Sequence, residues 1–160
     1  MNIAYLLTGS NLGNRVTNLK QAEELLEEKC GEIPGRSSLY ETGAWGKKDQ
    51  PAFLNQALVL KTIMDAKQLL KEVLVIEQQM GRIREKKYGP RLIDIDILLF
   101  NDDVYDYSFL KVPHPELQNR RFALTPLAEI AANKKHPVLL KTITELLAEC
   151  KDELPVKKYT

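Results

Sequence analysis

Short apolar runs bounded by glycine and proline recur along the chain and predict strands. Residues 3–8 form the first run, residues 37–42 the second and residues 53–62 the third. Residues 92–98 form a fourth, in which aliphatic residues alternate with two aspartates. Residues 9–14 contain two glycines and predict a turn after the first strand.

Apolar residues spaced three or four positions apart predict helices between these strands. Leucines and alanines at this spacing in residues 19–30 predict a helix that Gly31 ends. Asp65 can cap a second helix together with Gln68, three residues later, and Gly81 ends it. The resulting order, βαββαβ, predicts an α+β fold, a ferredoxin-like two-layer sandwich.

The last third of the chain predicts a C-terminal extension of this core. Residues 112–115 contain too much proline for a central strand, whereas residues 121–132 and 142–150 predict short helices. His136 precedes a proline and is expected at the surface. Because the sequence contains no repeat, low-complexity stretch or linker, we expect residues 1–160 to form a single domain.

Composition and charge narrow the classes of function. The formal net charge is +1 over 160 residues, and nucleic-acid or membrane partners usually require a clear basic excess, so neither is expected. Cys30 and Cys150 lie far apart and match no zinc or redox spacing. The first apolar run is too short for a signal peptide or a membrane span, which predicts a cytoplasmic protein.

Two carboxylates lie two residues apart in the fourth strand. Successive strand side chains point to opposite faces, so Asp94 and Asp96 share one face while the neighbouring isoleucines occupy the other. Like charges roughly 6.5 to 7 Å apart on a half-buried surface require a cation. A divalent metal such as Mg²⁺, or a pair of such ions, would meet this requirement, and so would arginines such as Arg91.

A basic segment precedes the two aspartates directly. Residues 81–91 begin with glycine, end in Gly-Pro-Arg and carry three arginines and two lysines, which predicts a loop. Such a run is often only a solvated surface. Beside paired carboxylates it suits phosphate chemistry, because phosphoryl transfer is catalysed mainly by positioning and by cations that accept developing negative charge.

Several segments together resemble the 6-hydroxymethyl-7,8-dihydropterin pyrophosphokinase family of folate biosynthesis. The most specific is Gly-Pro-Arg-Leu-Ile-Asp-Ile-Asp at residues 89–96, and the similarity is nearly full-length and in the family's order. The other matching segments are residues 9–12, 49–51, 53–55, 113–115 and 119–122.

This resemblance implies an ATP-dependent enzyme, a transferase that moves a pyrophosphoryl group from ATP to the hydroxymethyl group of the pterin and releases AMP. It implies two Mg²⁺ ions held by Asp94 and Asp96, with ATP as co-substrate. We expect a monomer.

The resemblance also implies the residues of each subsite. The residues implied for catalysis are Arg82, Arg91, Asp94, Asp96 and His114. The residues implied for ATP binding are Glu77, Arg82, Arg84, Lys87, Tyr88, Arg91, His114 and Arg120. The residues implied for pterin binding are Asn11, Thr42, Trp45, Phe53, Asn55 and Phe122, with the two phenylalanines on opposite faces of the ring.

The chain departs from the family pattern at four positions. Lys87 and Tyr88 stand where relatives can carry arginine and tryptophan. Leu74 and Phe109 stand where some relatives carry a glutamine toward ribose and an arginine toward phosphate. These replacements predict weaker nucleotide binding, because lysine lacks the bidentate fork of arginine and leucine lacks an amide.

Two other functions are compatible with parts of the sequence. The same strand and helix order is found in RNA-recognition modules, but those need exposed aromatic residues on a basic sheet face, whereas residues 94–96 present acids. A nucleotidyltransferase acting on another acceptor could use the same two carboxylates, and its products would distinguish it.

Overall fold

The fold of the chain is given by a computed structural model, which describes residues 1–43, 51–81 and 92–160. The helices and strands are β1 (Asn2–Ser10), α1 (Arg15–Lys29), β2 (Glu32–Arg36), β3 (Tyr40–Thr42), β4 (Phe53–Thr62), α2 (Ala66–Gln79), β5 (Asp94–Phe100), β6 (Tyr105–Asp106), β7 (Lys111–Val112), the 3₁₀ turn η1 (Leu117–Asn119), α3 (Arg121–Ala131), α4 (Ile143–Glu149) and β8 (Val156–Lys158).

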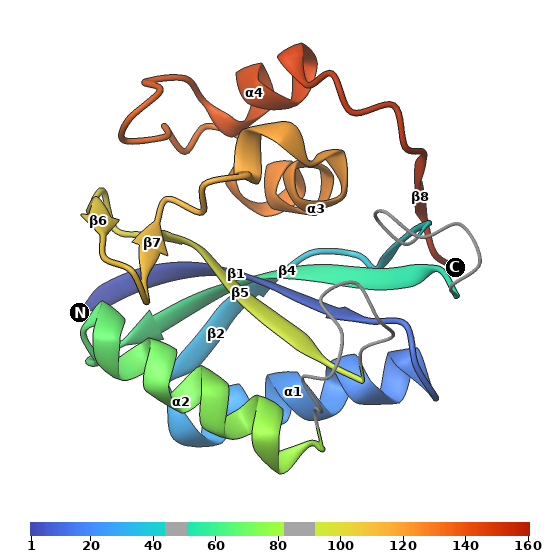
Figure 1. Ribbon diagram of the computed structural model, residues 1–160, viewed down its shortest axis with the longest axis vertical. Coiled ribbons are helices and arrows are strands. Elements are labelled where there is room, and N and C mark those ends of the chain that lie inside the picture. The colour runs from blue at the N-terminus through green and yellow to red at the C-terminus, as the bar shows by residue number, and fades with distance from the viewer. Residues whose placement is uncertain (44–50, 82–91) are drawn as a thin grey trace.

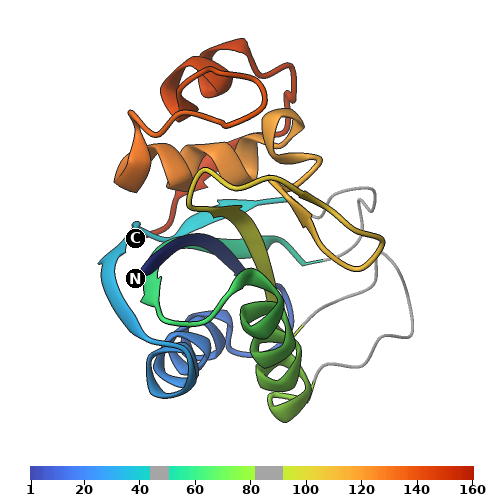
Figure 2. The same ribbon diagram turned by 90° about the vertical axis from the view of Figure 1, so that its left-hand side faces the viewer.

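One antiparallel sheet lies between two helical layers. Its strand order is β5-β1-β4-β3-β8, and β2 also pairs with β4. Helices α1 and α2 cover one face, and α3 and α4 cover the other (Figures 1 and 2). The predicted ferredoxin-like βαββαβ core is confirmed, and the predicted extension forms a further layer on the second face. None of the helices in the described part of the chain has the length and apolarity needed to cross a membrane.

The ends of the two core helices follow local sequence signals. In the predicted capping box of α2, the Gln68 amide donates to the Asp65 carboxylate at 2.8 Å, and the Asp65 amide donates to the Gln68 side chain at 2.9 Å. Asn14 caps α1 by accepting a hydrogen bond from the Thr17 amide at 3.1 Å. Gly81 follows α2 with a φ of 87°, a conformation that favours glycine.

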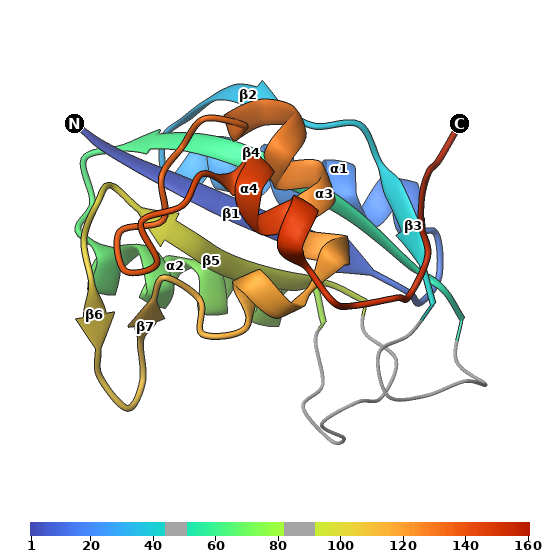
Figure 3. The ribbon, with the colours of Figure 1, turned by 90° about the horizontal axis from the view of Figure 1, so that it is seen from above.

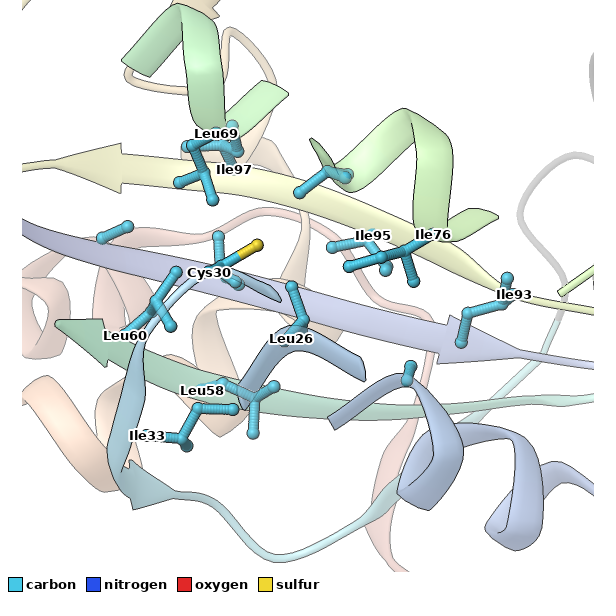
Figure 4. Close-up of a cluster of buried hydrophobic side chains, with 14 of the residues drawn as sticks. Leu26, Cys30, Ile33, Leu58, Leu60, Leu69, Ile76, Ile93, Ile95 and Ile97 are labelled. Carbon is cyan, nitrogen blue, oxygen red and sulfur yellow. The ribbon is translucent and has the colours of Figure 1, made fainter. Parts of the chain in front are cut away.

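The apolar core is divided by the sheet. On the α1/α2 face, Ile93, just before β5, and Ile95 and Ile97 of β5 pack with Leu26 of α1 and Ile76 of α2 (Figure 4). Leucines and alanines of α3 and α4 pack on the opposite face against β1 and β5. Fully burying one such leucine stabilises the fold by about 1.5 to 3 kcal/mol, so both faces contribute to stability.

Two sequence-based expectations are wrong in detail, and strand β8 is one that the sequence did not predict. The strand expected at residues 37–42 is shorter, because β3 covers only Tyr40–Thr42 and β2 precedes it. Strand β8 was not expected, since three polar-flanked residues form a strand only by pairing with β3. His136 is buried, not exposed, and its Nδ1 accepts the amide hydrogens of Val138 and Leu139 at 3.2 and 3.0 Å.

A cluster of polar side chains holds α3 against the start of β3. One oxygen of Glu129 on α3 accepts from the Tyr40 hydroxyl at 2.5 Å, and the other accepts from the Ser38 amide at 2.8 Å. Partial burial alone would raise the pKa of the Glu129 carboxyl, but the hydrogen bonds from Tyr40 and Ser38 outweigh it and lower the pKa below 4.5. Burial and the same bond raise the pKa of Tyr40 to about 12.

Removing the Glu129 charge should therefore destabilise the fold. At pH 7 we expect Glu129→Gln to lower Tm by about 2 to 4 °C, the effect of losing one net hydrogen bond of about 1 kcal/mol. Because the folded pKa is depressed, this stabilisation is complete above the unfolded pKa and is lost as pH falls through the folded pKa. Thermal unfolding of wild type and Glu129→Gln from pH 7 downward should show the two curves converging in acid. Glu24→Gln, at an exposed position on α1, should change Tm little at any pH.

Candidate active site

Three strands bring polar positions into one row across the α3 face of the sheet. Gly9 of β1 is paired on one side with Asp94 of β5 and on the other with Asn55 of β4. The residues next to them in sequence, Leu54 and Ile95, point the other way into the α1/α2 core, so Asp94 and Asn55 face α3. A carboxylate and an amide therefore lie in one row with a glycine between them.

The missing side chain at Gly9 is required by its neighbours. A Cβ atom at this position would lie 2.4 Å from Asn55 Nδ2 and 3.7 Å from Phe53 Cδ1. The amide and the aromatic ring thus lie against the Gly9 backbone. The turn expected at residues 9–14 begins later, because β1 continues through Ser10; glycine inside a strand is a known signal of close approach.

Asn55 brings to this row a hydrogen-bond acceptor that has no partner among the described residues. The side chain is 4% exposed, and its Nδ2 donates to the Thr8 carbonyl at 3.2 Å. Its Oδ1 is buried and has no hydrogen-bond partner among the described residues. Because a buried acceptor without a partner is unfavourable, this oxygen suits a ligand that donates an N–H group.

The two aspartates share a face, as the alternation predicts. Asp94 and Asp96 are half-buried, while Ile93, Ile95 and Ile97 lie in the core. Glu77, a buried residue of α2, accepts the Ile95 amide hydrogen at 2.8 Å and so holds the strand between the two carboxylates.

The donor set fits Mg²⁺. In the described ranges no group of three or more histidine, cysteine or acidic side chains is arranged to hold a metal. Mg²⁺ commonly binds through one or two carboxylates, with waters and substrate phosphates completing its shell, so Asp94 and Asp96 suffice as protein ligands.

His114 is held in a fixed orientation beside β5. Its amide donates to the Leu98 carbonyl at 2.9 Å, which is available because the pairing of β5 with β1 skips Leu98. Its Nδ1 accepts from the Glu116 amide at 3.1 Å. Burial, and then the charge of Arg120, lower the pKa of His114 to about 4, although Glu116 opposes this. The neutral ring therefore carries its proton on Nε2, which can donate to an anion.

The remaining predicted residues in the described ranges lie near the start of α3, just after β1, at the last residue of β3 and at the first residue of β4. The Arg120 guanidinium carbon lies 5.7 Å from the centre of the Phe122 ring, which brings one ATP and one pterin candidate together. Asn11 is buried and donates to the Pro51 carbonyl at 3.1 Å. Thr42, opposite Phe53 in the sheet, donates its hydroxyl to the Pro155 carbonyl at 2.9 Å.

Six predicted site residues lie outside the described ranges, and their roles stay predictions. They are Trp45, Arg82, Arg84, Lys87, Tyr88 and Arg91.

Two departures from the family pattern, Leu74 and Phe109, lie in the described ranges, and both side chains are exposed. Leu74 is exposed on α2. Phe109 stacks on Tyr107 with ring centres 5.3 Å apart, and Lys67 Nζ lies 4.6 Å from the Tyr107 ring centre.

Comparison with known proteins identifies the family. Residues 5–132 match the family described as 7,8-dihydro-6-hydroxymethylpterin-pyrophosphokinase (HPPK). The chain belongs to the HPPK family. The resemblance inferred from the sequence motifs is therefore confirmed.

Relatives agree with this assignment over most of their length. The chain is 44% identical over 149 residues to the 2-amino-4-hydroxy-6-hydroxymethyldihydropteridine pyrophosphokinase of Aquifex aeolicus, covering 93% of this chain and 92% of the relative. It is 46% identical over 130 residues to the enzyme of the same name from Bacillus subtilis, covering 81% and 78%. Among solved structures, Plasmodium falciparum HPPK-DHPS has the same fold, with a TM-score of 0.76 at 23% identity, covering 93% of this chain and 43% of that one.

HPPK enzymes of folate biosynthesis transfer a pyrophosphoryl group from ATP to the hydroxymethyl group of 6-hydroxymethyl-7,8-dihydropterin. This chain has the same activity. The alternatives left open by the sequence, an RNA-binding module or a nucleotidyltransferase, are not favoured.

The close approach at Gly9 predicts that a methyl group there displaces Asn55. We expect Gly9→Ala to weaken pterin binding by about tenfold or more, because the buried amide must move and lose hydrogen bonds. ATP-analogue binding should change much less. Calorimetric titration of each ligand measures both effects.

Gly35→Ala provides a matched control in β2, where a Cβ atom would lie 3.5 Å from Val59 Cγ2, an ordinary contact. Unchanged pterin affinity in Gly9→Ala would contradict the argument from close approach.

Proposed function

We propose that the transfer takes place along the row Asp94–Gly9–Asn55. The observation that supports this is the strand register, which separates the carboxylate from the amide by two interstrand spacings, about 10 Å. A pterin ring bound at Asn55, whose amide lies over the Gly9 backbone, can direct its hydroxymethyl group toward Asp94 on the other side of β1.

The pterin subsite is built from one amide and two aromatic faces. Asn55 Oδ1 accepts an N–H group at the edge of the ring, which supplies the partner that this buried oxygen lacks among the described residues. Phe53 and Phe122 contact opposite faces of the ring and contribute area and orientation. Asn11, Thr42 and Trp45 complete this end of the site.

Asp94 and Asp96 hold two Mg²⁺ ions in this proposal. When bound, these ions neutralise charge on the triphosphate and bring it close to the hydroxymethyl group. Because both carboxylates lie on β5, a triphosphate held by such ions would lie on the side of the row opposite Asn55.

Transfer follows from this arrangement without a covalent enzyme intermediate. The hydroxymethyl oxygen forms a bond to the β-phosphorus of ATP, the bond from that phosphorus to the oxygen bridging the α-phosphate breaks, and the hydroxyl proton passes to solvent. AMP leaves with the negative charge.

His114 and several basic side chains stabilise the negative charge that develops on the departing AMP. His114 donates from Nε2, and Arg120 supplies positive charge beside the α3 N-terminus. Arg82, Arg84 and Arg91 are assigned the same task, with Lys87 and Tyr88 contacting the nucleotide. Glu77 borders the nucleotide and holds β5 in register.

We assign the enzyme to the cytoplasm as a single-domain monomer without nucleic-acid or membrane partners. Its two cysteines, Cys30 and Cys150, are free, which is consistent with a reducing compartment. Light scattering after size exclusion measures the oligomeric state.

Product identification tests the function. The protein is incubated with ATP, Mg²⁺ and 6-hydroxymethyl-7,8-dihydropterin, and the products are separated and weighed by mass spectrometry. AMP together with a pterin diphosphate supports the proposal. ADP, or AMP with free pyrophosphate, contradicts it.

The metal assignment predicts that Asp94→Asn and Asp96→Asn each lower kcat on the order of 100-fold or more, since each removes a charged ligand. In metal-free buffer their Tm should be unchanged or higher, because one of two like charges is gone. Asp106→Asn, at an exposed aspartate of β6, is the control and should keep normal kcat and Tm. Marked unfolding of either active-site variant without Mg²⁺ would make the aspartates structural partners of arginine.

The pterin subsite predicts a selective loss of affinity. We expect Asn55→Ala and Phe122→Ala each to weaken pterin binding by about tenfold or more and ATP-analogue binding by less than about threefold. Gln56→Ala is the matched control, because this neighbouring amide points to the other face and donates to the Ser37 carbonyl. Titration of each ligand separately decides the question, and equal losses for both ligands would indicate general loosening of the fold.

A further inference from the structure

The C-terminal segment, residues 150–160, contacts both sides of the proposed pterin subsite. It leaves α4, passes the beginning of α3 and then runs beside β3 as β8 (Figure 3). None of its residues resembles a catalytic motif. Its contacts are nevertheless concentrated at the two elements that carry Phe122 and Thr42.

At the first contact, Asp152 caps α3 from a distance. The residue before the helix, Arg120, provides no side-chain cap. Instead, Asp152 Oδ2 accepts the amide hydrogen of Arg121, the first residue of α3, at 3.1 Å. A carboxylate here satisfies one of the unpaired N-terminal amides and interacts favourably with the helix dipole.

The Arg121 side chain strengthens the same contact. Its Nε donates to the Asp152 carbonyl at 2.9 Å, and its Nη2 donates to the Cys150 carbonyl at 2.8 Å. The beginning of α3 is therefore bound to the C-terminal segment through three hydrogen bonds, immediately before Phe122.

At the second contact, the segment holds the end of β3. Asp152 Oδ1 accepts the Leu154 amide at 3.0 Å and so turns the chain toward β3. There the Pro155 carbonyl accepts the Thr42 hydroxyl, and Val156 pairs with Thr42. Thr42 lies opposite Phe53 in the sheet.

Tyr159, the residue after β8, makes two further contacts. The Tyr159 amide donates to the Leu39 carbonyl at 2.8 Å. The Arg15 guanidinium lies 5.5 Å from the Tyr159 ring centre and binds Glu41 at 2.6 Å.

We propose that Asp152 is a positioning residue for the pterin, because its two carboxylate oxygens set the position of the α3 end that carries Phe122 relative to the β3–β4 end that carries Phe53. Binding a flat ring between two aromatic faces requires both faces to be held closely in place. This inference rests on the proposed pterin subsite. A purely structural cap would stabilise the fold but would not distinguish pterin from ATP.

The test compares Asp152→Ala, Asp152→Asn and Glu153→Ala. Glu153 is the control, an exposed acid in the same segment. Affinities for 6-hydroxymethyl-7,8-dihydropterin and for a non-hydrolysable ATP analogue with Mg²⁺ are measured by calorimetry, well below the Tm of each variant, and KM and kcat are measured for both substrates.

For Asp152→Ala we expect the pterin Kd and KM to rise about five- to tenfold, while ATP-analogue affinity changes less than about twofold. Asp152→Asn should recover part of the loss, because its amide oxygen can still accept one of the two amide hydrogens. Glu153→Ala should behave like wild type.

A second variant covers the case in which Asp152→Ala does not fold. Arg121→Gln removes the guanidinium bonds to the C-terminal segment but keeps the Asp152 cap, and we expect a smaller rise in pterin KM of about two- to threefold.

Unchanged pterin affinity in both Asp152→Ala and Arg121→Gln would overturn the inference, and so would equal losses for pterin and ATP. Failure of wild-type protein to form a pterin diphosphate would instead overturn the proposed function, so the two failures are distinguishable.

Discussion

The close approach of Asn55 to the Gly9 backbone is the constraint on which the candidate site depends. Any side chain at Gly9 would occupy the place of the Asn55 amide. With glycine there, the Asn55 amide of β4 lies over the β1 backbone, next to the strand that carries the two aspartates. In the proposed site, this close packing sets the position of a pterin bound at Asn55 relative to Asp94, as direct transfer between two bound substrates requires.

In the proposed site, the charges around this row favour an anion that binds together with Mg²⁺, because Asp94 and Asp96 place two carboxylates on one face of β5. The lowered pKa of His114, about 4, keeps its ring neutral at pH 7, so it acts as an oriented donor and adds no further charge beside Arg120. The Glu77 carboxylate accepts the amide hydrogen of Ile95, which holds the β5 backbone between the two aspartates.

The C-terminal extension gives the site its second side. Without α3, the Asn55 face of the sheet would present apolar residues of β1 and β5 to water, and the pterin would contact one wall only. The extension covers this face with leucines of α3 and α4 and places Arg120 and Phe122 at the beginning of α3. Glu129 of α3 bonds directly to Tyr40 of β3, and Asp152 bonds the beginning of α3 to the segment that pairs with β3 as β8, which explains how a short helix keeps a defined position over the sheet.

The sequence by itself determined the features that depend on neighbours in the chain. The α2 capping box, strand β4, the shared face of Asp94 and Asp96 and the Gly-Pro-Arg block follow from local spacing. The tertiary structure decided the features that depend on distant residues. The need for glycine at position 9, the Glu77 bond to β5 and the Asp152 cap on α3 each arise from a contact between segments far apart in sequence. Backbone propensity and side-chain periodicity carry no information about such contacts, because they report only which face a residue occupies and not what lies opposite it.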